Sequence, residues 1–185
     1  MRKFIPVVAL LLATFGALRA GAQTLTADEK AFMDQHLSDI VTTEITRLND
    51  AALAKVFAVP FYSVKMIIKE DDGGEGYTSF TAARVGTQLV NVTAPGTDGD
   101  LPKFLKMIDP KFKLAADADA TVVQQALDAL YPPFSDSDKK EVKFTHTGNQ
   151  WMFVRGKFFD DKKGYVFTTG ADGTITAVKY LLKLP

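Results

Sequence analysis

Paired carboxylates are the commonest groups in this sequence that could do acid–base chemistry. They occur at four places: Asp71-Asp72, Asp117 with Asp119, Asp136 with Asp138, and Asp160-Asp161. A hydrolase that uses two carboxylates needs at least one of them partly buried, with a raised pKa. All four places have the composition of turns or helix starts, where aspartate is common for backbone reasons. We therefore expect turns and caps there rather than a catalytic pair.

The two histidines, His36 and His146, are the remaining candidates for metal binding or proton transfer. A zinc site needs three or four ligands, and the sequence contains no cysteine and no paired-histidine motif. The serine motifs of hydrolases and the glycine-rich phosphate loops are also missing. Oxygen-rich loops at residues 72–75 and 97–100 lack the spacing of a calcium loop. The sequence thus predicts no metal, no cofactor and no catalytic residue.

Aromatic residues are abundant, with 14 Phe, 5 Tyr and 1 Trp. In the strand expected over residues 150–159, Trp151, Phe153 and Arg155 alternate onto one face. If that face is open, its aromatic rings and single arginine suit a protein partner or an amphipathic small ligand. We include His146, near the end of the preceding strand, in this candidate binding site. The alternative is that the aromatic residues form the core.

The N-terminus has the pattern of a secretory signal peptide. Arg2 and Lys3 precede an uncharged apolar run, which small residues at Ala20 and Ala22 follow. We expect cleavage after Ala22, so that residues 1–22 are removed and no stable membrane anchor remains. Loss of the three basic residues at positions 2, 3 and 19 leaves 19 basic against 22 acidic residues. The resulting net charge of −3 argues against nucleic-acid binding, and the protein is expected to be periplasmic or secreted.

The first half of the mature chain predicts helices followed by strands. Thr26 and Glu29 have the spacing of a helix capping box. Apolar residues recur at helical spacing behind them: Met33, Leu37, Ile40, Val41, Ile45 and Leu48. We predict one helix over residues 27–48 and another over residues 51–58. Strands over residues 61–69, 77–85 and 88–94 follow, joined by turns.

The second half repeats this order. Residues 101–108 predict a short helix, and Asp119 is expected to cap a longer one that ends at Pro132-Pro133. Four strands complete the chain, over residues 141–147, 150–159, 164–169 and 174–184. Their short connections, including residues 160–163, predict a meander of hairpins.

Two stretches of the halves resemble each other. Residues 66–81, MIIKEDDGGEGYTSFT, and residues 156–169, GKFFDDKKGYVFTT, both contain an Asp-Asp turn followed by Gly-Tyr and a Thr-rich strand. The fold class is therefore predicted to be α+β, with helices packed on an antiparallel meander in two similar helix-helix-sheet subdomains. These cover residues 23–94 and 101–185, with residues 95–100 as the linker. This order is similar to the tandem folds of secreted protease- and β-lactamase-inhibitor type, and the single unit is similar to small PepSY-like domains. Neither architectural likeness implies a site residue.

These observations favour an exported, non-enzymatic binding or protein-interaction protein of the bacterial envelope, acting through the aromatic sheet face. The alternative is a small envelope hydrolase or isomerase that uses carboxylates and His146. A cleft that gathers His146 with acidic residues would favour the enzyme, and an exposed Trp151 would favour the binding face.

Overall fold

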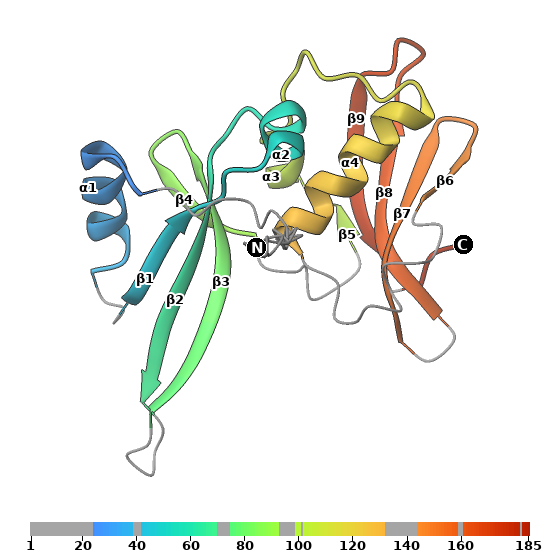
Figure 1. Ribbon diagram of the computed structural model, residues 1–185. Helices are drawn as coiled ribbons and strands as arrows, with labels where there is room; N and C mark the ends of the chain where they lie inside the picture. The colour runs from blue at the N-terminus through green and yellow to red at the C-terminus, as the bar shows by residue number, and fades with distance from the viewer. Residues whose placement is uncertain are drawn as a thin grey trace, which may run out of the picture.

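The computed structural model describes residues 24–38, 42–69, 75–92, 99–100, 102–131, 144–158, 161–181 and 183–185. Short helices and two antiparallel sheets make up this part of the chain (Figure 1). The fold is therefore α+β, as the sequence predicts. The expected signal peptide, the Asp71-Asp72 turn, and Asp136 and Asp138 lie outside the described residues.

The first sheet has the strand order β1-β2-β3-β4. Its strands are β1 (Thr42–Arg47), β2 (Phe61–Lys69), β3 (Glu75–Val85) and β4 (Gln88–Asn91), and each pairs antiparallel with its neighbour. The predicted strand over residues 61–69 is confirmed. The turn at Gly86-Thr87 is confirmed as well, and Gly86 adopts a φ of 60°, which glycine accommodates readily.

The predicted long helix over residues 27–48 is wrong. Helix α1 (Ala27–His36) ends at its C-cap Leu37, and part of the remaining segment forms β1. The helical spacing of apolar residues arises here from two elements, because Met33 lies on α1 whereas Ile45 lies on β1. Thr42, Thr43 and Thr46 are β-branched residues, which are enriched in strands.

Side-chain caps start the first two helices. The Oγ1 atom of Thr26 accepts from the Glu29 N–H, and the Glu29 carboxylate accepts from the Thr26 N–H, so the predicted capping box is confirmed. Helix α2 (Ala51–Val56) begins after Asp50, whose Oδ1 accepts the N–H groups of Ala52 and Leu53.

The second half begins with β5 (Gly99–Asp100), a two-residue strand formed by the last residues of the expected linker. Helix α3 (Pro102–Leu105) and helix α4 (Asp117–Leu130) follow. Asp119 is not the cap of α4, because the N-cap residue is Ala116. Asp119 lies within the first turn, and its Oδ2 accepts the N–H groups of Ala115 and Ala116.

The second sheet has the order β5-β9-β8-β7-β6. Its remaining strands are β6 (Phe144–Thr147), β7 (Gln150–Phe158), β8 (Asp161–Thr169) and β9 (Ile175–Leu181). The predicted meander is confirmed for these four strands. Strand β8 begins within the connection predicted over residues 160–163, because Asp161 pairs with Phe158, and Asp160 lies outside the described residues.

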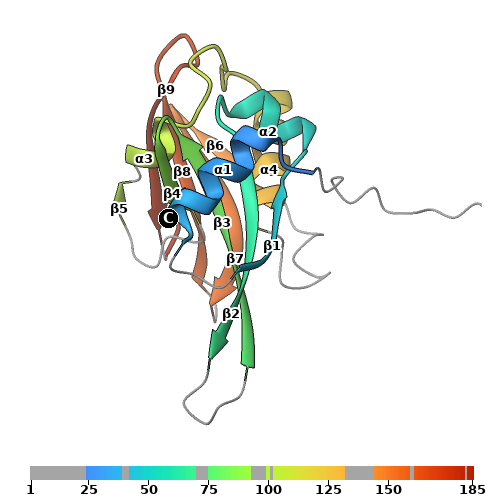
Figure 2. The same ribbon diagram turned by 90° about the vertical axis from the view of Figure 1, so that its left-hand side faces the viewer.

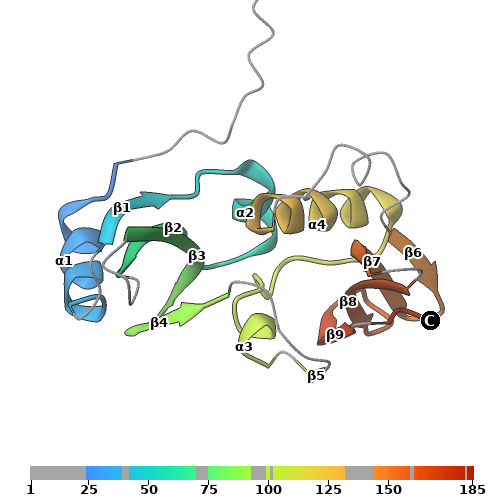
Figure 3. The ribbon, with the colours of Figure 1, turned by 90° about the horizontal axis from the view of Figure 1, so that it is seen from below.

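The main core lies between the two sheets, around α2, α3 and α4 (Figure 3). It combines residues from both halves of the chain, including Leu53, Val56, Phe57, Phe61, Phe104, Met107, Leu127, Phe153 and Phe167. Backbone hydrogen bonds also cross between the halves, from Ala58 N–H to the Met107 carbonyl and from Asp109 N–H to the Val56 carbonyl. The segments expected as two subdomains thus share one core.

A smaller cluster covers the other face of the first sheet. Helix α1 lies across that face (Figure 2), and Phe32, Met33 and Leu37 pack against Tyr62, Val64 and Ala82. Both faces of the first sheet are therefore covered near its centre. The hairpins β2–β3 and β7–β8, which contain the two similar stretches, end on the same side of the molecule (Figures 1 and 2).

Candidate binding pocket

The expected open aromatic face is closed. Trp151 is only 2% exposed and Phe153 is fully buried, because this face of β7 turns toward the core. The ring of Phe153 packs edge-on against Phe167 of β8, with 5.1 Å between their centroids. The expectation of a broad aromatic surface is therefore wrong, since alternation along a strand assigns residues to faces without showing which face is covered.

Arg155 points into the molecule as well. Its guanidinium forms an ion pair with Asp128 of α4, and its side chain is only 8% exposed. The charge also lies 5.9 Å from the centre of the Tyr131 ring. Burial raises the pKa of Tyr131, whose hydroxyl donates to the Val92 carbonyl. Arg155 therefore joins β7 to α4, and it is not available to a partner.

His146 is the exposed member of the predicted site. Its imidazole stacks flat on the indole of Trp151, with ring centroids 3.8 Å apart and an angle of 6° between the planes. The Nε2 atom of His146 donates to the Gly148 carbonyl at 2.7 Å. The structure brings His146 and Trp151 together, and it separates them from Arg155, which pairs with α4.

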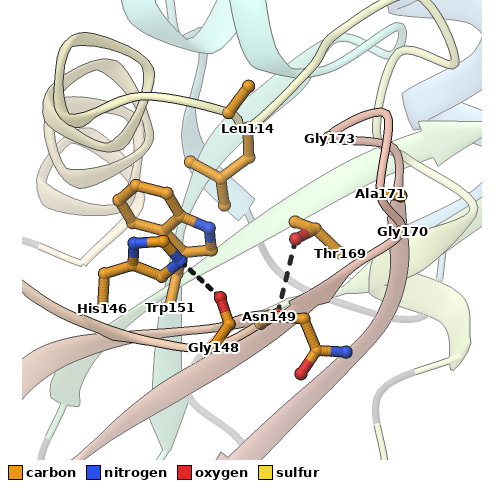
Figure 4. Close-up of a pocket in the computed structure, with 10 residues that line it drawn as sticks. Leu114, His146, Gly148, Asn149, Trp151, Thr169, Gly170, Ala171 and Gly173 are labelled. Carbon is orange, nitrogen blue, oxygen red and sulfur yellow. Dashed lines mark hydrogen bonds between the residues drawn. The ribbon is translucent and has the colours of Figure 1, made fainter.

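A pocket of about 520 Å³ opens beside this stack (Figure 4). It lies at the end of the second sheet where the turn from β6 to β7 meets the turn from β8 to β9. Its walls are Leu114, Ala115, His146, Gly148, Asn149, Trp151, Thr169, Gly170, Ala171 and Gly173. Backbone hydrogen bonds connect the segments that form the walls. Thr169 N–H donates to the Asn149 carbonyl of the β6–β7 turn, and Leu114 N–H donates to the Gly173 carbonyl of the β8–β9 turn.

The indole N–H of Trp151 has no hydrogen-bond partner among the described residues. Two other polar side-chain atoms of the described part are sealed from solvent without a partner, Gln124 Oε1 and Arg155 Nε. The indole nitrogen is not sealed in this way, and Figure 4 shows it on the side of the ring that faces Thr169. An unpaired donor on a nearly buried ring thus faces the pocket.

Among the described residues, the pocket walls contain no lysine, arginine or carboxylate. Asp172 belongs to the same turn, but its carboxylate accepts hydrogen bonds from Lys113 and Thr174. The hydrogen bond from Lys113, followed by those from Thr174, holds the pKa of Asp172 well below its usual range. The described walls therefore offer polar but uncharged contacts around the ring of His146.

Acid–base chemistry finds little support in this geometry. No carboxylate of the described part of the chain lies with His146 in the pocket walls. Across the described residues, no group of three His, Asp or Glu side chains is placed to hold a metal ion. The cleft that the hydrolase alternative requires is not present in this part of the chain.

Sequence reasoning missed Leu114, Thr169 and the turn from Gly170 to Gly173 as pocket residues. A signal for the turn was available, because in a meander the turns β6–β7 and β8–β9 lie at the same end of the sheet. Leu114 had no such signal. It reaches this end through a segment between α3 and α4 whose Lys113 bridges to Thr174.

Comparisons with known proteins give no match for this chain among protein-family models, curated proteins or solved structures. In the described residues, no helix is both long and apolar enough to cross a membrane.

Proposed function

We propose that this protein is an exported, non-enzymatic binding protein whose ligand enters the pocket beside Trp151. The observation that carries the proposal is the indole N–H, which has no partner among the described residues and faces described pocket walls without lysine, arginine or carboxylate. The indole nitrogen is not sealed from solvent, so its N–H is open to a ligand acceptor, and such a hydrogen bond contributes about 0.5–1.5 kcal/mol. The basic and apolar N-terminus supports export.

Binding is favoured over catalysis because His146 is already engaged. Its ring stacks on Trp151 and its Nε2 donates to the Gly148 carbonyl, and the described wall residues include no acidic side chain that could act with it. A general base needs hydrogen-bond reach to the proton that it removes and a partner that tunes it. The pocket supplies hydrogen bonds and packing instead.

The proposal is tested by ligand retention. Purified protein is incubated with the low-molecular-weight fraction of an envelope extract, separated by gel filtration, and analysed by mass spectrometry. We expect one chemically unchanged compound to stay with the protein. Trp151→Phe, which keeps an aromatic ring but removes the N–H, should lose the compound, whereas Tyr165→Phe should retain it. Equal retention by both variants, or retention of nothing, contradicts the proposal.

A protein-interaction role is a second candidate, and one observation favours it. Tyr77 on β3 is 61% exposed, the one large hydrophobic residue of the described chain with that exposure. Lys65 of β2 lies over its ring at 5.4 Å, on the same face of the projecting hairpin. Exposed tyrosines are enriched among interface hot spots.

Envelope pull-downs separate the two roles. A protein partner that docks on the hairpin should be captured by wild type and by Trp151→Phe, and lost with Tyr77→Ala. Capture that is insensitive to Tyr77→Ala contradicts the hairpin role and leaves the pocket proposal in place.

A further inference from the structure

The walls beside Trp151 mix hydrogen-bond donors with acceptors. The indole N–H donates only, and the Asn149 amide can donate and accept, whereas the Thr169 hydroxyl donates to the Asn149 carbonyl and can accept from a ligand. A ligand that matches such a wall needs groups that both donate and accept, and hydroxyl groups do both.

Charged ligands fit this pocket poorly. The wall residues that the structure describes include no lysine, arginine or carboxylate, and the nearby Asp172 is already paired with Lys113 at 2.8 Å. An ion that entered would lose hydration without gaining a charged partner, which is unfavourable. The ligand is therefore expected to be neutral.

A wholly apolar ligand fits no better. Leu114, Ala115 and Ala171 provide apolar wall surface, but the indole N–H would stay unpaired under an apolar molecule. The volume of about 520 Å³ lies within the range of about 300–1,000 Å³ that is usual for small-molecule sites. A ring with an apolar C–H face and a hydroxyl-bearing edge satisfies both kinds of wall.

We propose that the pocket binds a neutral sugar unit. Its C–H face packs against Ala115 and Ala171, which are exposed in the pocket walls, and one hydroxyl oxygen accepts the indole N–H of Trp151. His146 acts as a positioning residue, since its stack on the indole and its bond to Gly148 hold the ring in place. This inference rests on the proposed function, because it names the ligand class of the same pocket.

The test uses the fluorescence of Trp151, the single tryptophan of the chain. Purified protein is titrated separately with cellotriose, maltotriose and tri-N-acetylchitotriose, and with trigalacturonic acid and N-acetyl-dialanine amide as charged and peptide probes. We expect saturable change with at least one neutral trisaccharide and none with the other two probes. No response to any neutral trisaccharide overturns the inference.

Variants locate the binding. Thr169→Val keeps the shape of a nearly buried side chain but removes its hydroxyl, and it should weaken sugar binding about tenfold. For Trp151→Phe, sugar binding is measured by calorimetry and should be weakened at least as much. Tyr165→Phe should leave the sugar affinity unchanged. If neither pocket variant alters the sugar affinity, the sugar binds elsewhere and the inference is overturned. Binding of the peptide probe in the pocket also overturns it. If the protein retains an envelope compound but binds no sugar, only the ligand class is refuted. If it neither retains a compound nor binds a sugar, the proposed function is refuted as well.

Discussion

Glu29 shows how one buried carboxylate ties three elements together. It is 6% exposed, and its oxygens accept from Thr26 of the cap and from the Tyr62 hydroxyl of β2, while Arg47 of β1 lies 3.0 Å away. Burial raises the pKa of Glu29, but the hydrogen bonds from Thr26 and Tyr62 and the charge of Arg47 outweigh burial and leave it lowered. Burial and the bond to Glu29 raise the pKa of Tyr62.

Replacing this carboxylate should destabilise the fold. Glu29→Gln leaves one acceptor oxygen where there were two and removes the counter-charge of Arg47. We expect the free energy of unfolding at pH 7 to fall by about 1–3 kcal/mol in urea denaturation. Glu44→Gln, at an exposed position on β1, is the control and should change little. Equal stability of Glu29→Gln and wild type would contradict the network.

The same network predicts a pH dependence. Because the folded pKa of Glu29 lies below its unfolded value of about 4.3, its stabilisation is present above that pH and is lost as the pH falls through the folded pKa. Urea denaturation of wild type and Glu29→Gln should therefore differ most at neutral pH and converge as the pH falls through the lowered folded pKa of Glu29. A difference that grows toward low pH would show that the carboxylate form is not the stabilising one.

At the scale of the elements, β7 and β8 approach closely around Gly164. A Cβ atom at this position would overlap the carbonyl oxygen of Phe153, next to the bulge between Val154 and Gly156. Gly164→Ala should cost about 3 kcal/mol, since backbone must move to admit it. Gly86→Ala has a positive φ but open space around it, so strain alone should cost about 1 kcal/mol. Thermal unfolding that ranks the two variants in the reverse order would contradict this register.

Helix α4 is fastened to the second sheet by the pair of Asp128 and Arg155. Asp128 is 28% exposed and can be rehydrated when its partner is removed, but Arg155 cannot. Asp128→Ala should therefore lower the free energy of unfolding by about 3 kcal/mol. Arg155→Met should lower it by less. The double variant should recover part of the loss, as chemical denaturation of all four proteins would reveal. Equal effects of the single variants would mean that Arg155 is hydrated.

The elements also show what the sequence could and could not predict. Local signals predicted most element boundaries. The cap residue Thr26 marked the start of the first helix, and the turns at residues 86–87 and 148–149 marked the ends of strands. The break after His36 was missed, since the apolar spacing continued across two elements. The binding site was only half foreseen. His146 and Trp151 do meet, but the burial of Phe153 and Arg155 depends on α4, which packs on that face through contacts distant in sequence.

For the whole molecule, the shared core predicts one cooperative unfolding transition. Residues of α2 and α4 pack together in one cluster, and backbone hydrogen bonds cross between the halves. Separating residues 24–92 from residues 99–185 would expose apolar surface on both. Calorimetry should give one peak whose calorimetric and van't Hoff enthalpies agree. Two resolved transitions would instead support the independent subdomains that the sequence suggested.

The central claim concerns the pocket beside Trp151, and the indole N–H reports on it most directly. With one tryptophan in the chain, the ¹H–¹⁵N spectrum of labelled protein contains a single indole cross-peak. Adding the low-molecular-weight envelope fraction should shift this peak toward the position of a hydrogen-bonded indole, and Thr169→Val should reduce the shift. An indole peak that stays in place, while the fraction is shown to bind elsewhere or not at all, would contradict the account.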